Sequence, residues 1–244
     1  MRQVEQKYFS PYAQALYDYH MHKGKNPLFI VREDGLRSEL PVELFFTTYE
    51  NFSALEKIAI DSVSGDALDV GAGAGRHTKE LLNRGVDVTA LEIDPVLSDL
   101  MIDRGIGKVV NSDIFNYHPR DKYQNILLLN HGLGIAGNLN NLSVLLKHLQ
   151  RLLKPGGRIL ADSLDVTKTR DKVHLDYHEK LKREGRYVGE IRMYMEHGSR
   201  KGDLFQWLHI DDKLLKEYAQ KADFNCRVEK RLKTGEYLAI LSLD

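Results

Sequence analysis

One stretch constrains the fold of this chain more than any other: Ala67-Leu-Asp-Val-Gly-Ala-Gly-Ala-Gly-Arg76. A short β-favouring run ends at three alternating glycines, Gly71, Gly73 and Gly75, and a helical pattern follows them. Glycine reaches backbone angles closed to other residues, and its missing Cβ lets a ligand lie against the main chain. The first turn of the next helix adds unpaired N–H groups and a positive dipole end. This strand–turn–helix pattern therefore predicts a binding site for a nucleotide-like or zwitterionic ligand. The alternative is a tight turn without a ligand.

Composition narrows the class of protein. The 244 residues include 35 basic and 35 acidic side chains, and 42% are hydrophobic. This length suits one large α/β domain, and no internal repeat or linker divides the chain. A formal net charge of zero argues against an extended nucleic-acid surface, so nucleic acid is not the expected partner. The one cysteine, Cys226, excludes an intrachain disulfide and a cysteine-based metal cluster.

The first residues, Met1-Arg-Gln-Val-Glu-Gln6, lack the apolar core of a signal peptide. No apolar run in the sequence approaches the length of a membrane span. We therefore expect a cytoplasmic protein without a membrane partner. The sequence carries no signal of oligomeric state.

Strands and helices alternate from residue 66 onward. The expected strands are residues 67–70, 86–91, 107–110, 123–129 and 158–161. Pro95 stands at the first turn of one intervening helix, and Pro155-Gly-Gly157 is expected to end the helix of residues 140–153. This alternation predicts βαβ units, that is, a doubly wound and mostly parallel sheet with right-handed crossovers. The last two strands, 226–232 and 237–243, are joined by a link so short that they must form an antiparallel hairpin.

Two segments lie outside this alternation. The N-terminal segment predicts a helical and hairpin cap, with a helix opening at Ser10-Pro11, strands at 28–31 and 36–40, and a helical region after Pro41. A further hairpin, of residues 187–196 and 204–210, is expected as an insertion. We interpret residues 1–244 as a single domain with three parts: the cap 1–60, the ligand-binding core 61–165, and the substrate-side insertion with C-terminal strands 166–244.

The cap is rich in aromatic residues near its start. These rings can line a substrate pocket or simply form core. They are Tyr8, Phe9, Tyr12, Tyr17 and Tyr19.

Acidic residues stand at the ends of successive expected strands, where an open α/β sheet places its ligand crevice. Glu92 closes the second strand, and a carboxylate there can accept hydrogen bonds from both hydroxyls of a ribose. Asp113 follows the third strand and can accept from an exocyclic adenine amine, with Ile93 and Ile114 on either side of the ring. Each acid alone can also be a surface residue or a helix cap. Their joint spacing favours a nucleoside site.

With these features the chain resembles the class I S-adenosylmethionine-dependent methyltransferases. The resemblance covers about residues 50–163, and the antiparallel ending is similar to that family's seven-stranded sheet. The motifs that carry it are Asp69-x-Gly71-x-Gly73-x-Gly75, Glu92, Asp113-Ile114, the strand ending at Asn130, and Leu152-Leu-Lys-Pro-Gly-Gly157.

The resemblance implies a methyltransferase that binds S-adenosyl-L-methionine. It implies that Glu92 holds the ribose, that Asp113 contacts the adenine and that Asn130 lines the cofactor cleft. The same family pattern turns the glycine loop toward the methionine part of the cofactor; its glycines are Gly71, Gly73 and Gly75.

An NAD(P)-dependent oxidoreductase is the nearest alternative, because it shares the sheet and the ribose carboxylate. That class normally has G-x-G-x-x-G, whereas Arg76 stands in the place of its third glycine. Asp69, just before the turn, would repel a pyrophosphate but would favour a sulfonium or an α-amino group. Both points favour the methyltransferase. A module that binds the cofactor without chemistry is a third possibility.

Residues on the acceptor side are expected in the loop after the fourth strand, Asn130-His-Gly-Leu-Gly-Ile-Ala-Gly137. His131 is the catalytic candidate, because an imidazole can take a proton near pH 7. A histidine beside a glycine turn can equally tether the backbone. Asp162 and Asp165, after the fifth strand, can face the same cavity or cap a helix.

The methyl acceptor is expected to be a small molecule, since no nucleic-acid-binding motif accompanies the neutral charge. The alternative is a macromolecule, tRNA or protein, bound by a basic face that includes Arg227, Arg231 and Lys233. Trp207, in the inserted hairpin, can cap an acceptor pocket or pack on the sheet. No metal is expected, because nothing completes a site around His174 and His178.

Overall fold

The computed structural model describes residues 3–22 and 26–243 of the chain. The chain forms two compact units. The first comprises the described parts of residues 1–53, 66–117 and 192–205, and the second comprises those of residues 54–65, 118–191 and 206–244. None of the helices in the described ranges is both long and apolar enough to cross a membrane.

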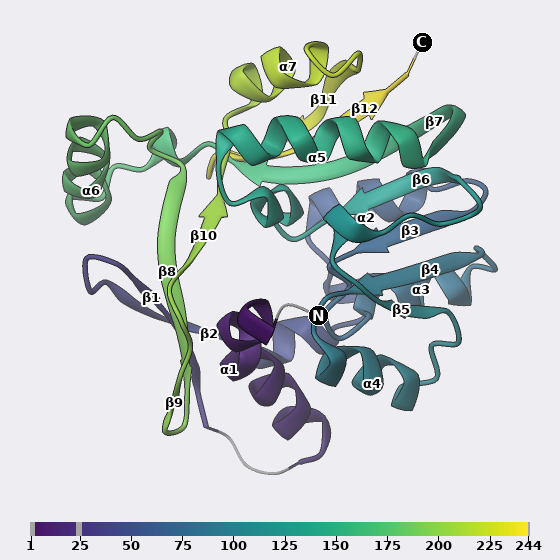
Figure 1. Cartoon of the computed structure of the whole chain (residues 1–244), viewed down its shortest axis with the longest axis horizontal. Coiled ribbons are helices and arrows are strands. Elements are labelled where there is room, and N and C mark those ends of the chain that lie inside the picture. Colours follow the sequence, from purple (N-terminus) through teal and green to yellow (C-terminus); the bar gives the residue numbers. More distant parts are fainter. Residues whose placement is uncertain (1–2, 23–25, 244) are drawn as a thin grey trace. The chain divides into compact units, whose positions relative to one another are not determined.

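Seven strands make up the large sheet: β3 (Ala67–Val70), β4 (Val88–Glu92), β5 (Val109–Asn111), β6 (Tyr123–Leu128), β7 (Leu153–Leu164), β11 (Asn225–Arg231) and β12 (Glu236–Ser242). Their order is β11-β12-β7-β6-β3-β4-β5 (Figure 1). The pairs β3–β4, β4–β5 and β6–β7 are parallel, while β12 is antiparallel to both β7 and β11. The predicted α/β fold, mostly parallel with an antiparallel C-terminal hairpin, is confirmed.

In the first unit, two helices follow the parallel strands: α3 (Arg76–Asn83) comes after β3 and α4 (Pro95–Asp103) after β4. Pro95 occupies the first helical position, where a missing N–H costs nothing, and the Asp94 side chain caps α4 by accepting from the Val96 N–H at 2.8 Å. Ala90, Met101 and Ile106 are fully buried together beneath these elements. They form the local core on which the glycine turn rests.

The N-terminal helix, α1 (Gln3–His20), is longer than the sequence predicted. The predicted start at Ser10-Pro11 is wrong, since Pro11 lies inside the helix. A proline normally breaks a helix, but α1 packs against α4 and buries Ala13, Ala15 and Leu16. Tertiary packing of this apolar stripe therefore outweighs the local preference.

The region after Pro41 is also less regular than the predicted helix. It contains two 3₁₀ helices, Val42–Phe46 and Tyr49–Asn51, and then α2 (Ala54–Ser62), which belongs to the second unit. The segment predicted as one cap is thus shared between the two units. The sequence pattern did not separate 3₁₀ from α-helix because both place apolar residues on one side of the chain.

A small sheet joins two segments that are far apart in the sequence. The predicted N-terminal hairpin is present as β1 (Leu28–Arg32) and β2 (Arg37–Leu40), which pair antiparallel. The other edge of β1 pairs antiparallel with β8 (Glu190–His197), with Ile30 opposite Met195. Figure 1 shows β8 running alongside β1, with β9 (Arg200–Lys201) turning back onto β8. Of the predicted strand 204–210, β10 covers Phe205–Leu208.

The second unit adds four further helices: α2, α5 (Leu139–Leu152), α6 (Lys172–Arg183) and α7 (Asp212–Gln220). The leucine stripe of α5 is fully buried at Leu142, Leu145 and Leu149. Helix α7 packs on β11 (Figure 1), and Asp211 caps it by accepting from the N–H groups of Lys213 and Leu214.

The sequence predicted that Pro155-Gly-Gly157 ends the helix before the next strand. This is wrong, because α5 ends at Leu152 and these three residues lie inside β7. The pairing of β7 with β6 shifts here, from Tyr123 opposite Leu153 to Asn125 opposite Arg158. Between these pairs β7 advances five residues and β6 two, so the proline and the two glycines lie in an irregular part of the ladder that does not end the strand.

Candidate active site

The glycine turn between β3 and α3 is left-handed at all three glycines. The φ angles of Gly71, Gly73 and Gly75 are 68°, 58° and 76°, a region that side chains with a Cβ rarely adopt. The Gly71 N–H donates to the Leu91 carbonyl at 2.8 Å, and the Gly75 N–H donates to the Ala72 carbonyl at 2.8 Å. The turn is therefore fixed both to β4 and within itself.

The structure gives Gly73 and Gly75 different surroundings. A Cβ on Gly75 would lie 2.3 Å from Cδ1 of Ile106, so this glycine is needed for the turn to pack on the core. A Cβ on Gly73 would lie 3.1 Å from the hydroxyl oxygen of Tyr12. The sequence pattern assigned the three glycines one role; in the structure Gly75 serves packing, while Gly73 faces a polar group.

Glu92 ends β4 and is 6% exposed. Both carboxylate oxygens accept from main-chain N–H groups, Oε2 from Gly73 at 2.8 Å and Oε1 from Asp94 at 3.0 Å. Burial raises the pKa of Glu92 to about 7, although these two hydrogen bonds favour the charged form. A carboxylate offers about four lone-pair positions, so Glu92 retains capacity to accept a further hydrogen bond.

The backbone after β4 is held by the side chain of Asn111 at the end of β5. Its Nδ2 donates to the carbonyls of Glu92 at 3.0 Å and Ile93 at 2.9 Å, and to the hydroxyl of Ser98 at 3.2 Å. These bonds fix the position of Ile93, which is half-buried.

Asp113 lies directly after β5. Its Oδ1 accepts from the Phe115 N–H at 2.9 Å and caps the 3₁₀ helix Ile114–Asn116. The sequence left open whether Asp113 caps a helix. In the structure it does so, with one of its two carboxylate oxygens. Ile114 is 4% exposed, and Asp113 is half-buried.

Asp69 lies in β3 and is 2% exposed. Its Oδ2 accepts from the hydroxyl of Thr78 on α3 at 2.6 Å. This bond ties the strand before the glycine turn to the helix after it. The buried carboxylate also places a negative charge directly before the turn.

Tyr12 on α1 was only one of five aromatic residues noted in the sequence. The structure places its hydroxyl next to Gly73, with its ring edge-on to Phe45 at a centroid distance of 5.1 Å. Burial, together with the nearby Glu92 carboxylate, raises the pKa of the Tyr12 hydroxyl above its usual value. No local sequence signal distinguishes Tyr12, because its position depends on how α1 packs. The side chains of Tyr8 and Phe9 lie outside the described part of the structure.

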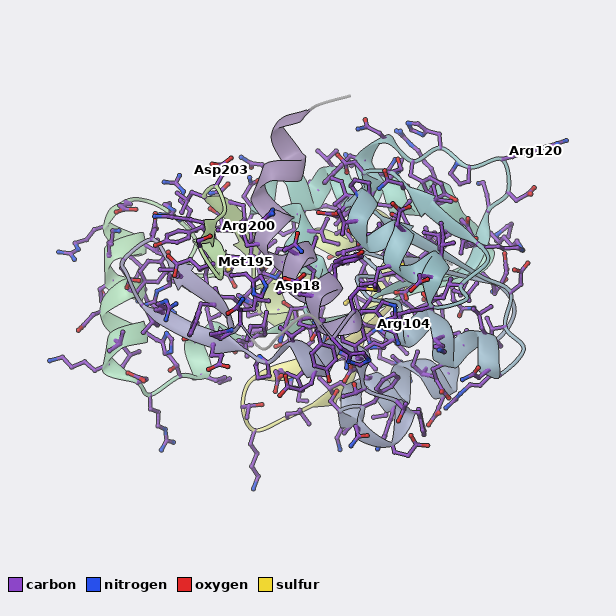
Figure 2. The ribbon with its side chains drawn as sticks, turned by 90° about the horizontal axis from the view of Figure 1, so that it is seen from below. Asp18, Arg104, Arg120, Met195, Arg200 and Asp203 are labelled. Carbon is purple, nitrogen blue, oxygen red and sulfur yellow. The ribbon has the colours of Figure 1, made fainter. Side chains whose placement is uncertain are left out.

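Two side chains labelled in Figure 2 hold the elements around this turn in place. Arg104, at the end of α4, donates to the Ala74 carbonyl at 2.7 Å, and its guanidinium carbon lies 4.7 Å from the centroid of the Phe46 ring. Asp18, on α1, is 3.2 Å from Nε2 of His197 on β8. Arg104 thus fixes the glycine turn to α4, and Asp18 fixes α1 to the small sheet.

The remaining predicted site residues, Asn130 and His131, lie in the second unit directly after β6. Both are left-handed, each with a φ of 61°, and Asn130 is exposed. The His131 N–H donates to Oδ1 of Asp162 on β7 at 2.8 Å, and Asp162 is 6% exposed. Asp165, by contrast, caps the 3₁₀ helix Val166–Lys168.

The His131 side chain has two neighbours that the sequence did not indicate. Its Nε2 lies 3.8 Å from Oε1 of Glu236 on β12, and its ring meets the ring of His209 edge-on at a centroid distance of 5.3 Å. Burial lowers the pKa of His209 to about 3, and His131 lowers it further. His209 and Glu236 follow His131 by many residues in the chain, so no local motif could identify them.

Trp207 packs against the loop that carries His131. A Cβ on Gly134 would lie 1.9 Å from Nε1 of Trp207, so the indole fills the space that a side chain would need. Of the pair His174 and His178, His178 is buried, at 7% exposure. Among residues 3–22 and 26–243, no three His, Cys, Asp or Glu side chains are grouped as a metal site requires.

Comparisons with known proteins agree with the fold and the glycine turn. The family model described as a methyltransferase domain matches residues 68–161. A solved structure of an S-adenosylmethionine-dependent methyltransferase from Bacteroides fragilis, in complex with S-adenosyl-L-homocysteine, is similar at 30% sequence identity and a TM-score of 0.85, covering 98% of this chain and 96% of that chain. No curated protein matches the chain.

Two more distant structures share the fold. The CcbJ methyltransferase from Streptomyces caelestis has 14% identity and a TM-score of 0.62, covering 80% of this chain and 95% of that chain. The amino pentose methyltransferase CalS10 from Micromonospora echinaspora, bound to S-adenosylmethionine, has 15% identity and a TM-score of 0.56, covering 79% of this chain and 92% of that chain.

The chain belongs to the S-adenosylmethionine-dependent methyltransferases. It is an enzyme whose cofactor is S-adenosyl-L-methionine. The choice between methyltransferase and NAD(P)-dependent oxidoreductase, which the sequence had left open, is decided in favour of the methyltransferase.

Proposed function

We propose that this methyltransferase acts on a small-molecule acceptor and that residues 1–244 work as one methyltransferase domain. The balanced charge of 35 basic and 35 acidic residues supports a small acceptor. CalS10, which has the same fold, is described as an amino pentose methyltransferase. A single domain is supported by the similarity to the Bacteroides fragilis enzyme, which extends over 98% of the chain.

The observation that carries the cofactor site is the hydrogen bond between the Gly73 N–H and Glu92. It sets a buried carboxylate that can still accept beside a bare main-chain turn. The hydroxyls of a ribose are suitable donors to such a carboxylate. We assign the ribose to Glu92, and the close main-chain approach to Gly71, Gly73 and Gly75, with Gly73 in the central position.

Four of the other predicted residues, namely Asp113, Ile93, Ile114 and Asp69, lie in the first unit with Glu92. Asp113 has one carboxylate oxygen outside its capping bond and can accept from the adenine amine. Ile93 and Ile114 offer apolar surface for the ring. Asp69 supplies a negative charge before the turn that favours a cationic ligand. Asn130, after β6, is assigned to the lining of the cofactor cleft.

The cofactor supplies an electrophilic methyl group on a positively charged sulfur. The chain therefore has no electrophile to create, and its residues act by orienting the reactants and excluding water. A base is needed where the acceptor carries a proton that must leave. We assign this role to His131, whose N–H is anchored by Asp162 and whose Nε2 lies near Glu236.

The rival acceptor, a tRNA or protein bound by the basic face of β11, loses support in the structure. Arg227 is paired with Glu229 at 2.7 Å, and Arg231 is paired with Asp212. Two of the cations expected to meet phosphates are thus partly neutralised by their own neighbours, which weakens the attraction for a polyanion.

Label transfer tests the proposed acceptor class. The purified protein is incubated with S-adenosylmethionine carrying a deuterated methyl group and a cell extract separated into metabolite, RNA and protein fractions. We expect the mass label in the metabolite fraction, and less of it there with Glu92→Ala at the same sub-saturating cofactor concentration. Label that enters RNA or protein instead would overturn the small-molecule assignment.

A further inference from the structure

Two histidines of the second unit each have a buried ring nitrogen without a hydrogen-bond partner in the described structure. These are Nδ1 of His131 and Nδ1 of His209. Folded proteins contain few buried polar groups without a partner, because such a group has lost its hydrogen bonds to water without a replacement. The two rings are in edge-to-face contact, 5.3 Å apart and at 82°. Two such nitrogens in one place indicate a site that a polar ligand completes.

The backbone that carries His131 is strained in the same place. Asn130 and His131 are consecutive left-handed residues, and neither is a glycine. Such conformations cost free energy, persist only where the surroundings enforce them and cluster at functional sites. Here the enforcing contact is the hydrogen bond from the His131 N–H to the buried carboxylate of Asp162. The orientation of His131 is therefore held by the fold.

Three groups surround His131: Glu236, Asp162 and His209. Glu236 lies 3.8 Å from Nε2, and a carboxylate there favours the tautomer with its proton on Nε2. That tautomer leaves a lone pair on Nδ1, which can accept a proton. Asp162 accepts from the main chain of His131 and adds a second negative charge nearby. Burial lowers the pKa of His209 to about 3, so His209 is neutral and adds no positive charge beside His131.

We propose that His131 and His209 form an acceptor subsite for a nucleophile with a dissociable proton, namely a hydroxyl or an amino group. The inference rests on the proposed function and adds the chemistry of the acceptor to it. Nδ1 of His131 accepts the proton of the nucleophile, and Nδ1 of His209 makes a second hydrogen bond that positions the same group. A thioether or an ether carries no proton to donate, so it would leave Nδ1 of His131 unpaired and is rejected.

The step balances without another reactant. The lone pair of the hydroxyl or amine forms a bond to the methyl carbon, and the carbon–sulfur bond breaks with its electron pair left on sulfur. The proton released from the nucleophile passes to Nδ1 of His131. Glu236 then stabilises the imidazolium, in the way that a carboxylate supports a histidine base in hydrolytic enzymes.

Phenol and anisole are matched probes for this subsite, because they share a ring and differ in whether the oxygen carries a proton. Imidazole ¹⁵N NMR of the full chain, saturated with S-adenosyl-L-homocysteine, follows both histidines. We expect His131 in the tautomer with its proton on Nε2, and phenol to shift both Nδ1 resonances. Anisole, which has no proton to donate, should leave the Nδ1 resonance of His131 unshifted. A proton on Nδ1 of His131, equal shifts from both probes, or no shift from phenol would overturn the proposal.

Two variants separate a subsite from a merely structural role. His209→Phe should weaken phenol binding about tenfold, the factor that corresponds to one lost hydrogen bond of about 1.4 kcal/mol. His209→Gln, which keeps a hydrogen-bonding group, should recover part of the loss, and equal phenol affinity in all three proteins would contradict the proposal. Calorimetry with S-adenosyl-L-homocysteine separates failure of the proposed cofactor site from failure of the acceptor subsite. If S-adenosyl-L-homocysteine does not bind the wild type, the proposed cofactor site is wrong. If it binds normally but the protein does not discriminate between phenol and anisole, only the subsite is wrong.

Discussion

The main-chain N–H of Gly73 donates a 2.8 Å hydrogen bond to Oε2 of Glu92, nineteen residues further along the chain. This bond joins the glycine turn after β3 to the acid at the end of β4, so the two motifs form one site. Because β3 and β4 are parallel neighbours, with Val70 opposite Leu91, their carboxyl ends meet at the same edge of the sheet. Replacing either residue should therefore affect the same ligand.

Glu92→Ala should weaken S-adenosylmethionine binding by roughly 1–3 kcal/mol, because two ribose hydroxyls lose a charged acceptor. Isothermal titration calorimetry measures the change. Asp99→Ala is the matched control: it removes an exposed carboxylate from α4 in the same unit and should leave the affinity unaltered. Wild-type affinity in Glu92→Ala would show that the ribose assignment is wrong.

The affinity for the cofactor should rise with pH up to about neutrality. Burial raises the pKa of Glu92 to about 7, and ribose hydroxyls prefer the charged carboxylate. Binding then requires loss of a proton below this pH, so affinity should fall by up to about tenfold per pH unit on acidification. Calorimetry between pH 5.5 and 8 tests this, with Glu92→Gln expected to remove the dependence. A wild-type affinity that is flat over this range would refute the role of the Glu92 charge.

Gly75→Ala and Gly73→Ala should have different effects: the first should mainly lower stability, and the second should mainly lower cofactor affinity. At Gly75 the new Cβ would lie 2.3 Å from Ile106, so overpacking adds to the strain of a left-handed alanine, and we expect a loss of roughly 2–4 kcal/mol in the free energy of unfolding. At Gly73 the Cβ meets only the Tyr12 hydroxyl, at 3.1 Å. There we expect a smaller loss of stability, about 1–2 kcal/mol, and a larger loss of cofactor affinity. Urea unfolding and calorimetry on both variants measure the two effects, and identical behaviour would contradict the separation.

The parts of the site that the sequence predicted are those coded by neighbouring residues. The turn at Gly73 and the acid at Glu92 belong to strand–turn–helix patterns that repeat along the chain, so their spacing indicates the sheet edge. Tyr12 could not be identified, because its approach to Gly73 depends on the packing of α1 against α4. His209 and Glu236 were missed for the same reason, since contacts with His131 arise only when distant segments of the second unit fold together.

The errors in secondary structure have the same origin. Proline and glycine are reliable stop signals only where tertiary contacts do not oppose them. Pro11 remains inside α1 because the helix buries an apolar stripe, and Pro155 remains inside β7 because the pairing with β6 is irregular there. The pairing of β1 with β8 likewise could not be predicted from the sequence, since no residue pattern in either strand indicates its partner.

Gly134→Ala should destabilise the second unit by roughly 1–3 kcal/mol, because its Cβ would overlap the indole of Trp207, whose Nε1 lies 1.9 Å away. Trp207→Leu removes the ring and leaves room for the alanine. The double variant should therefore lose less stability than the sum of the two single variants. A double-mutant cycle by urea unfolding measures this coupling, and strict additivity would show that the two residues do not share the space.

His209 should make the protein less stable in mild acid. Burial lowers its pKa to about 3, compared with an ordinary value of 6.5 that applies in the unfolded chain. Below pH 6.5, His209 therefore binds a proton in the unfolded chain but not in the folded chain. The free energy of unfolding falls as pH falls. Between pH 7.5 and pH 5 this amounts to at most about 2 kcal/mol. His209→Leu removes the titrating group, so its stability relative to wild type should improve by that amount over the same interval. Urea unfolding at the two pH values measures this effect. If the difference in free energy of unfolding between His209→Leu and wild type is the same at both pH values, His209 is protonated as readily in the folded as in the unfolded chain, which contradicts the prediction.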